Sequence, residues 1–87
     1  MSNTESDMIR DHVIRARIQP VKQLGLPQLY EVQIRSIEIA KELDLEHNMP
    51  DVCGALDRKK FREENNIQIK SRTGPKAGRT VVWTFLV

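Results

Sequence analysis

The stretch that most constrains the fold is residues 48–62, because it reads as a helix with two unlike sides. Asn48 can cap this helix, and Pro50 stands in the first turn, where its missing N–H does no harm. At about 100° per residue, four apolar residues share one face and predict contact with a core: Met49, Val52, Cys53 and Leu56. The opposite side carries small residues and then cations: Asp51, Gly54, Ala55, Arg58, Lys59 and Arg62.

The chain around this helix is long enough for one small domain. It has 87 residues, of which 39% are hydrophobic and 30% charged, and this composition is typical of a globular protein. No apolar run approaches the roughly 18 residues that span a membrane, and the polar first residues are unlike a signal peptide. We therefore expect a cytoplasmic protein.

Charge is divided unevenly along the chain. Residues 1–57 hold 6 Lys and Arg against 10 Asp and Glu, whereas residues 58–87 hold 8 against 2. The net charge of +2 therefore hides a strongly basic C-terminal end. Such a division favours one surface that faces phosphates, although a solvated charged surface is the alternative.

The first half of the chain reads as a helix, a strand and a short helix. Residues 1–5 are expected to be frayed, and a single domain is expected over residues 6–87. Thr4 or Ser6 can cap the first helix, which ends near Gly25, and Pro20 either kinks it or starts a new turn. The alternation over residues 30–35 predicts a half-buried strand. Ser36 can then cap a helix over residues 37–43, and residues 44–47 turn into the helix at 48–62.

The last third predicts a β-hairpin. Ile67 and Ile69 alternate with polar residues, residues 73–78 have turn composition, and residues 80–87 are rich in β-branched and aromatic residues. Trp83 and Phe85 are expected in the core. Four cations lie between residues 70 and 79 with no acidic residue among them: Lys70, Arg72, Lys76 and Arg79.

This order of elements, α-β-α-α-β-β, resembles the winged helix-turn-helix fold over residues 6–87. The resemblance is carried by the helices at 37–43 and 48–62, the turn between them and the basic hairpin at 70–79. It implies an α+β domain with a three-helix core and a small antiparallel sheet. It also implies duplex DNA as the partner, with the helix at 48–62 in the major groove and the hairpin, or wing, on the backbone or in the minor groove.

The same resemblance implies a set of DNA-binding residues. Arg58 can pair bidentately with guanine, whereas Lys59 can equally bind a phosphate. Asp51 and Asp57 oppose phosphate contact unless each accepts from a cytosine amino group, neutralises a neighbouring Arg or lies outside the contact. The alternative for the cations at the helix end is that they only oppose the helix dipole. The expected contacts are Gly54, Ala55, Arg58, Lys59, Arg62, Lys70, Arg72, Lys76 and Arg79.

A transcription regulator is thus the first expectation, and a protein-interaction module is the second. The second would dock a larger partner, or a second copy in a homodimer, through the acidic N-terminal half and the second face of the last strand, where Val82 and Leu86 lie. Cys53 falls on the apolar helix face, and His12 and His47 stand alone. We therefore expect no enzyme activity, catalytic residue, metal site, cofactor or small-molecule substrate.

Overall fold

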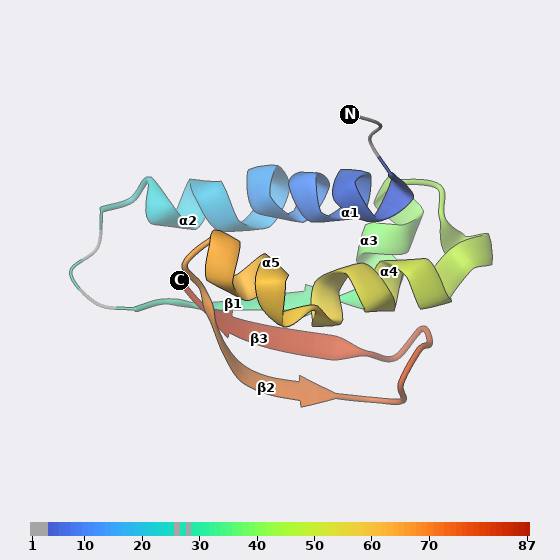
Figure 1. The fold of residues 1–87 in the computed structure, drawn as a ribbon. Helices are drawn as coiled ribbons and strands as arrows, with labels where there is room; N and C mark the ends of the chain where they lie inside the picture. Colours follow the sequence, from blue (N-terminus) through green and yellow to red (C-terminus); the bar gives the residue numbers. More distant parts are fainter. Residues whose placement is uncertain (1–3, 26, 28) are drawn as a thin grey trace.

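The computed structural model describes residues 4–25, 27 and 29–87, and it shows helices covering one face of a three-stranded antiparallel sheet (Figure 1). This arrangement confirms the prediction of a small α+β domain with an antiparallel sheet. No helix in these residues is long and apolar enough to cross a membrane. The elements, in chain order, are α1 (Glu5–Val13), the π-helical η1 (Ile14–Ile18), α2 (Gln19–Lys22), β1 (Glu31–Arg35), α3 (Ser36–Glu42), the 3₁₀ turn η2 (Glu46–Asn48), α4 (Met49–Asp57), α5 (Lys59–Glu64), β2 (Gln68–Thr73) and β3 (Val82–Leu86).

The first helical stretch starts one residue before the expected domain boundary. Thr4 is its cap, because the Thr4 side chain accepts from the Asp7 N–H and Asp7 in turn accepts from the Thr4 N–H. Residues 4 and 5 are therefore ordered by hydrogen bonds, while residues 1–3 lie outside the described part. The chain stays helical through Pro20, which stands in the first turn of α2 directly after the π-helical segment. Because proline has no N–H to donate, this local change of helix type accommodates it.

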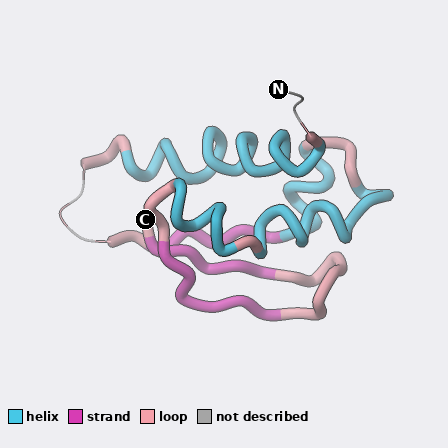
Figure 2. The backbone as a smooth tube through the Cα atoms, viewed as in Figure 1, coloured by secondary structure: helices cyan, strands magenta, loops and turns pink. Residues whose placement is uncertain are grey.

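The sheet has the order β1-β3-β2, so the C-terminal strand lies in the middle. Val32 pairs with Phe85 and Ile34 with Trp83, and all four side chains are buried. The predicted alternation of β1 is confirmed, since Glu31, Gln33 and Arg35 are exposed. Their side of the sheet carries no helix (Figure 2).

The core gathers the apolar residues expected from the sequence. Trp83 and Phe85 are completely buried, and Phe85 meets Phe61 edge to face with ring centroids 6.0 Å apart. Leu45 is buried in the connection between α3 and α4, next to Asp44, which adopts a left-handed φ of 57°. Tyr30, the first residue of the predicted alternation, precedes β1 and is 43% exposed.

Two residues that were expected to cap helices make other hydrogen bonds. Ser36 lies inside the first turn of α3, where it is buried, and no side-chain cap is present at Arg35. Asn48 makes no capping hydrogen bond either, and its Nδ2 donates to Glu5 and Asp51 at 2.7 and 2.9 Å. In both cases a distant segment offers the side chain a partner that competes with the local cap.

Candidate nucleic-acid interface

The helix predicted over residues 48–62 is two helices, α4 and α5, separated at Arg58. Arg58 has φ −70° and ψ 130°, an extended conformation that cannot continue an α-helix. The prediction of one continuous helix is therefore wrong. Lys59 and Arg62 belong to α5, so their positions relative to α4 do not follow from a single helical wheel.

One side of α4 is buried, and this side is wider than predicted. Met49, Val52, Cys53 and Leu56 are buried as expected, but Ala55 is also only 1% exposed. The outward orientation predicted for Ala55 is wrong, because both α1 and α3 pack against α4 and enlarge its buried face. Gly54 is exposed, and a Cβ added there would meet no atom within 4 Å.

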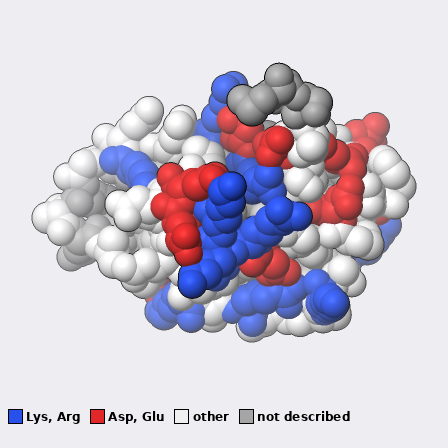
Figure 3. Space-filling view, viewed as in Figure 1, with Lys and Arg blue, Asp and Glu red and all other residues white. Residues whose placement is uncertain are grey.

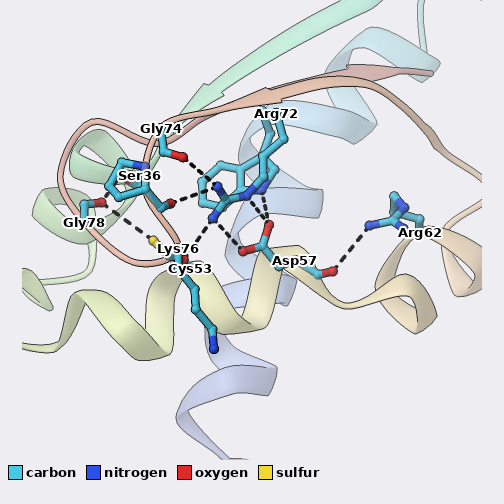
Figure 4. Close-up of polar contacts among 10 residues, drawn as sticks. Ser36, Cys53, Asp57, Arg62, Arg72, Gly74, Lys76 and Gly78 are labelled. Atoms are coloured by element: carbon cyan, nitrogen blue, oxygen red, sulfur yellow. Dashed lines mark hydrogen bonds and ion pairs between the residues drawn. The ribbon is translucent and has the colours of Figure 1, made fainter.

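The loop between β2 and β3, residues 74–81 (the hairpin loop), is held by the guanidinium of Arg72. Nε and Nη2 of Arg72 donate to the two carboxylate oxygens of Asp57, at the end of α4, at 2.8 and 2.9 Å. The other N–H groups donate to the carbonyl oxygens of Gly74, Pro75 and Lys76 at 3.2, 2.8 and 2.9 Å. All five guanidinium donors are thus used inside the protein, as Figure 4 shows. Arg72 was expected to contact DNA. Its guanidinium instead holds the hairpin loop and has no donor left for a DNA contact.

Asp57 receives a third donor from the sheet. Trp83 Nε1 donates to Oδ1 of Asp57 at 2.7 Å, and the Arg72 guanidinium lies 5.9 Å from the centre of the Trp83 ring. Partial burial alone would raise the pKa of Asp57, but the hydrogen bonds from Arg72 and Trp83 outweigh it and hold the pKa below its ordinary value. Asp57 is therefore ionised near neutral pH, and its charge is neutralised by Arg72, one of the roles considered for it.

The far end of the hairpin loop is fixed by α3 and α4. The carbonyl oxygen of Gly78 accepts from Ser36 Oγ at 2.7 Å and lies 3.6 Å from the Cys53 thiol, which donates to it. At Gly74 the backbone has a φ of +103°, and a Cβ would come within 2.8 Å of the Thr80 carbonyl oxygen. Glycine is therefore required at that position, and the loop has a defined shape against α4.

The cations expected at the interface fall into two groups. Lys59 lies 3.6 Å from Glu63, and Lys70 pairs with Glu31 on the side of the sheet that carries no helix. Arg62 donates weakly to the Asp57 carbonyl oxygen at 3.4 Å. The other expected cations have neither an ion pair nor a side-chain hydrogen bond within the described residues: Arg58, Lys76 and Arg79.

One face of the molecule collects much of this charge. Lys and Arg atoms gather over α5 and again along the hairpin, with Asp and Glu atoms between and beside them (Figure 3). The Lys76 side chain points away from Arg72, out of the hairpin loop (Figure 4). Exposed cations near a protruding loop can neutralise phosphates, so the arrangement suits a polyanion.

Sequence reasoning missed the residues that shape this surface. Ser36 resembled a helix cap and Trp83 an apolar core residue, yet Ser36 donates to the hairpin loop and Trp83 donates to Asp57, the carboxylate that binds Arg72. Only the indole N–H of Trp83 was a usable signal, because a buried indole requires an acceptor.

Comparisons with known proteins give no identity for the chain, since no family model, curated protein or solved structure matches it. Over residues 4–25, 27 and 29–87, no group of three or more His, Cys, Asp and Glu side chains could hold a metal ion. The geometry described above is therefore the basis for inferring function.

Proposed function

We propose that this chain is a winged helix-turn-helix domain that binds duplex DNA, as a small transcription regulator does. In this proposal α4 faces the major groove, and the hairpin loop is the wing that lies on the backbone or in the minor groove. The order of the elements and the antiparallel sheet β1-β3-β2 are compatible with such a domain. They support the winged helix-turn-helix architecture, and the distribution of charge supports DNA as the partner.

The observation that carries the proposal is how the charges at the end of α4 are disposed. Asp57 would repel phosphates if it were free, but Arg72 and Trp83 occupy its oxygens. Arg58 follows directly in the chain, and Lys76 and Arg79 extend from the loop that Arg72 holds against α4. The surface is therefore ordered before any ligand arrives, and this order reduces the entropy lost on binding. The surface also carries cations that have no ion pair among the described residues.

The test measures duplex affinity across a salt series. Fluorescence anisotropy with a random-sequence duplex should show log affinity falling against log salt, by about 0.9 for each phosphate neutralised. Lys76→Ala and Arg79→Ala should each make this slope less negative by about 1. Lys41→Ala removes an exposed cation on α3 and is the matched control, which should leave the slope unchanged. Absence of binding at low salt, or equal slopes for all variants, would refute the proposal.

A protein-interaction role is the second candidate, and an exposed apolar area favours it. Leu24, Leu29 and Tyr30 are 63%, 59% and 43% exposed beside the connection from α2 to β1. Leu29 and Tyr30 line a hollow of about 400 Å³, together with Val21 and Val87. Apolar side chains grouped around a hollow are typical of a contact surface. Val82 and Leu86, expected to provide that surface, are half-buried instead.

Sedimentation of the free chain separates this candidate from the first. If the area forms a homodimer, wild type will sediment as a dimer and Leu24→Glu with Leu29→Glu will sediment as a monomer. A concentration-independent monomer that still binds DNA would exclude the homodimer and leave the DNA proposal standing.

A further inference from the structure

A second concentration of cations lies away from the hairpin loop, in a hollow between α1 and α5. The hollow has a volume of about 170 Å³. Its lining includes Arg10 from α1, Lys60 from α5 and Arg58, the extended residue between α4 and α5. The complete lining is Asp7, Arg10, Arg58, Lys60, Phe61 and Glu64. Three cations from different elements thus converge on one space, large enough for a phosphate group.

The acids of the hollow do not satisfy these cations. Asp7 pairs with Nη2 of Arg10 and also accepts from the N-terminal end of α1. Nη1 of the same guanidinium is buried and has no hydrogen-bond partner among the residues that the structure describes. Glu64 lies 3.7 Å from Lys60, whereas Arg58 has no ionic partner within residues 4–25, 27 and 29–87. One positive charge is therefore left over, together with a buried donor that lacks an acceptor.

We propose that this hollow binds a phosphodiester group of the DNA backbone through Arg58, Lys60 and Arg10. The inference rests on the proposed duplex binding and deepens it, because it adds a backbone contact between α1 and α5. A phosphodiester carries one negative charge, which matches the excess of the hollow. Guanidinium groups donate to phosphate oxygens in pairs, and Lys60 contributes a point charge.

This assignment changes the role expected for Arg58. An arginine on the outward face of a continuous helix could reach a guanine edge in the major groove. Arg58 instead has an extended backbone between the two helices and lines the hollow beside α1. Arg58 is therefore a phosphate contact that positions the domain without reading sequence. Arg58→Ala should weaken binding by the same factor on all duplex sequences.

Lys60 and Lys59 provide a matched pair of variants. Both are lysines in the first turn of α5, with side chains 80% and 82% exposed, and each lies four residues before a glutamate partner. Only Lys60 lines the hollow. Their substitution by Ala should leave the fold intact, so any difference between the two reports on the hollow.

The first arm of the experiment tests the site without DNA. Inorganic phosphate is titrated against chloride at constant ionic strength, while backbone amide NMR shifts are recorded. In wild type and in Lys59→Ala we expect shifts at residues 10, 58 and 60, and in Lys60→Ala we expect these shifts to be lost. Shifts spread evenly over the surface, or equal responses in the two variants, overturn the inference whatever DNA does.

The second arm tests the ligand. Binding of a random-sequence duplex at 0.1 M salt should weaken about tenfold in Lys60→Ala, with a salt slope less negative by about 1, and should not change in Lys41→Ala. If phosphate binds in the hollow but Lys60→Ala binds DNA like wild type, the DNA assignment of the hollow is overturned while duplex binding stands. If wild type binds no DNA at all, the proposed function fails, and the inference falls with it.

Discussion

Replacing Gly54 by Ala should stabilise the fold and weaken binding to DNA. Gly54 lies in the middle of α4, and its backbone is right-handed helical. An added Cβ would meet no atom of the protein within 4 Å, so the substitution causes no clash. Glycine costs about 0.5–1 kcal/mol relative to alanine inside a helix, and this amount should be recovered. For a domain of this size, the melting temperature should rise by about 2–8 °C.

The same methyl group would stand on the exposed side of α4. If the groove of DNA approaches the backbone at Gly54, the added methyl group must push the DNA away. The affinity for DNA should then fall although the stability of the fold rises. Thermal unfolding followed by circular dichroism gives the first quantity, and anisotropy with a duplex gives the second. An increase in stability with unchanged affinity would show that nothing approaches Gly54, and its place in the interface would then be withdrawn.

Gly25 provides the control for the backbone argument. An added Cβ at Gly25 also meets nothing within 4 Å, but the residue has a left-handed φ of +64°. Gly25→Ala should therefore destabilise the fold by about 1 kcal/mol, opposite in sign to Gly54→Ala. A loss of stability in both variants would refute the reasoning from helix propensity and open space.

Three further predictions concern the hairpin loop. Arg72→Ala should destabilise the domain by about 1–2 kcal/mol in urea unfolding, because Asp57 and three carbonyl oxygens of the hairpin loop lose their donor. Arg72→Lys should fail to restore the loss, since an ammonium cannot fill the fork of acceptors. Gly74→Ala should lower the free energy of unfolding by about 1–3 kcal/mol in the same measurement, because the φ of +103° at Gly74 and the close Thr80 carbonyl exclude a side chain. The lowered pKa of Asp57 contributes stability that is fully present above its ordinary value of 3.8 and is lost as the pH falls through the folded-state pKa. The stability difference between wild type and Asp57→Asn should therefore shrink as the pH drops below about 4, and a difference that stays constant to pH 2 would contradict the assigned cause.

The protein-interaction candidate depends on a different surface and can be assessed independently. Leu24, Leu29 and Tyr30 lie beside the α2–β1 connection, whereas the unpaired cations lie near the end of α4 and on the hairpin loop. Charge variants should therefore leave sedimentation unchanged, and apolar variants should leave the salt slope unchanged. A variant that altered both would indicate that the two surfaces are coupled.

The candidate site was only partly predictable from its charges. Lys70, Arg72, Lys76 and Arg79 look alike as cations in a basic segment. In the structure Lys70 pairs across the sheet and Arg72 braces the loop, while Lys76 and Arg79 have no ion pair within the described part of the chain. Their ionic partners, Glu31 and Asp57, lie 39 and 15 residues away in the sequence, so neither spacing nor composition could assign these roles.

Local pattern by itself determined the elements and most of the core. The alternation at Val32 and Ile34 fixed which side of β1 is buried, and the helical spacing of Met49, Val52 and Leu56 fixed the inner face of α4. These predictions succeed because the burial of apolar surface is the main driving force for folding, and it selects side chains at periods of two or 3.6 residues.

Tertiary structure decided the interruption at Arg58, the burial of Ala55 and the internal role of Arg72. No proline or glycine marks Arg58, but the preceding Asp57 is held by Arg72 and Trp83, which lie 15 and 26 residues away. Ala55 is buried because α1 and α3 both pack on α4, which a helical wheel of one segment does not contain. Hydrogen bonds and packing between distant segments compete with local preference, and only the folded chain shows which of them prevails.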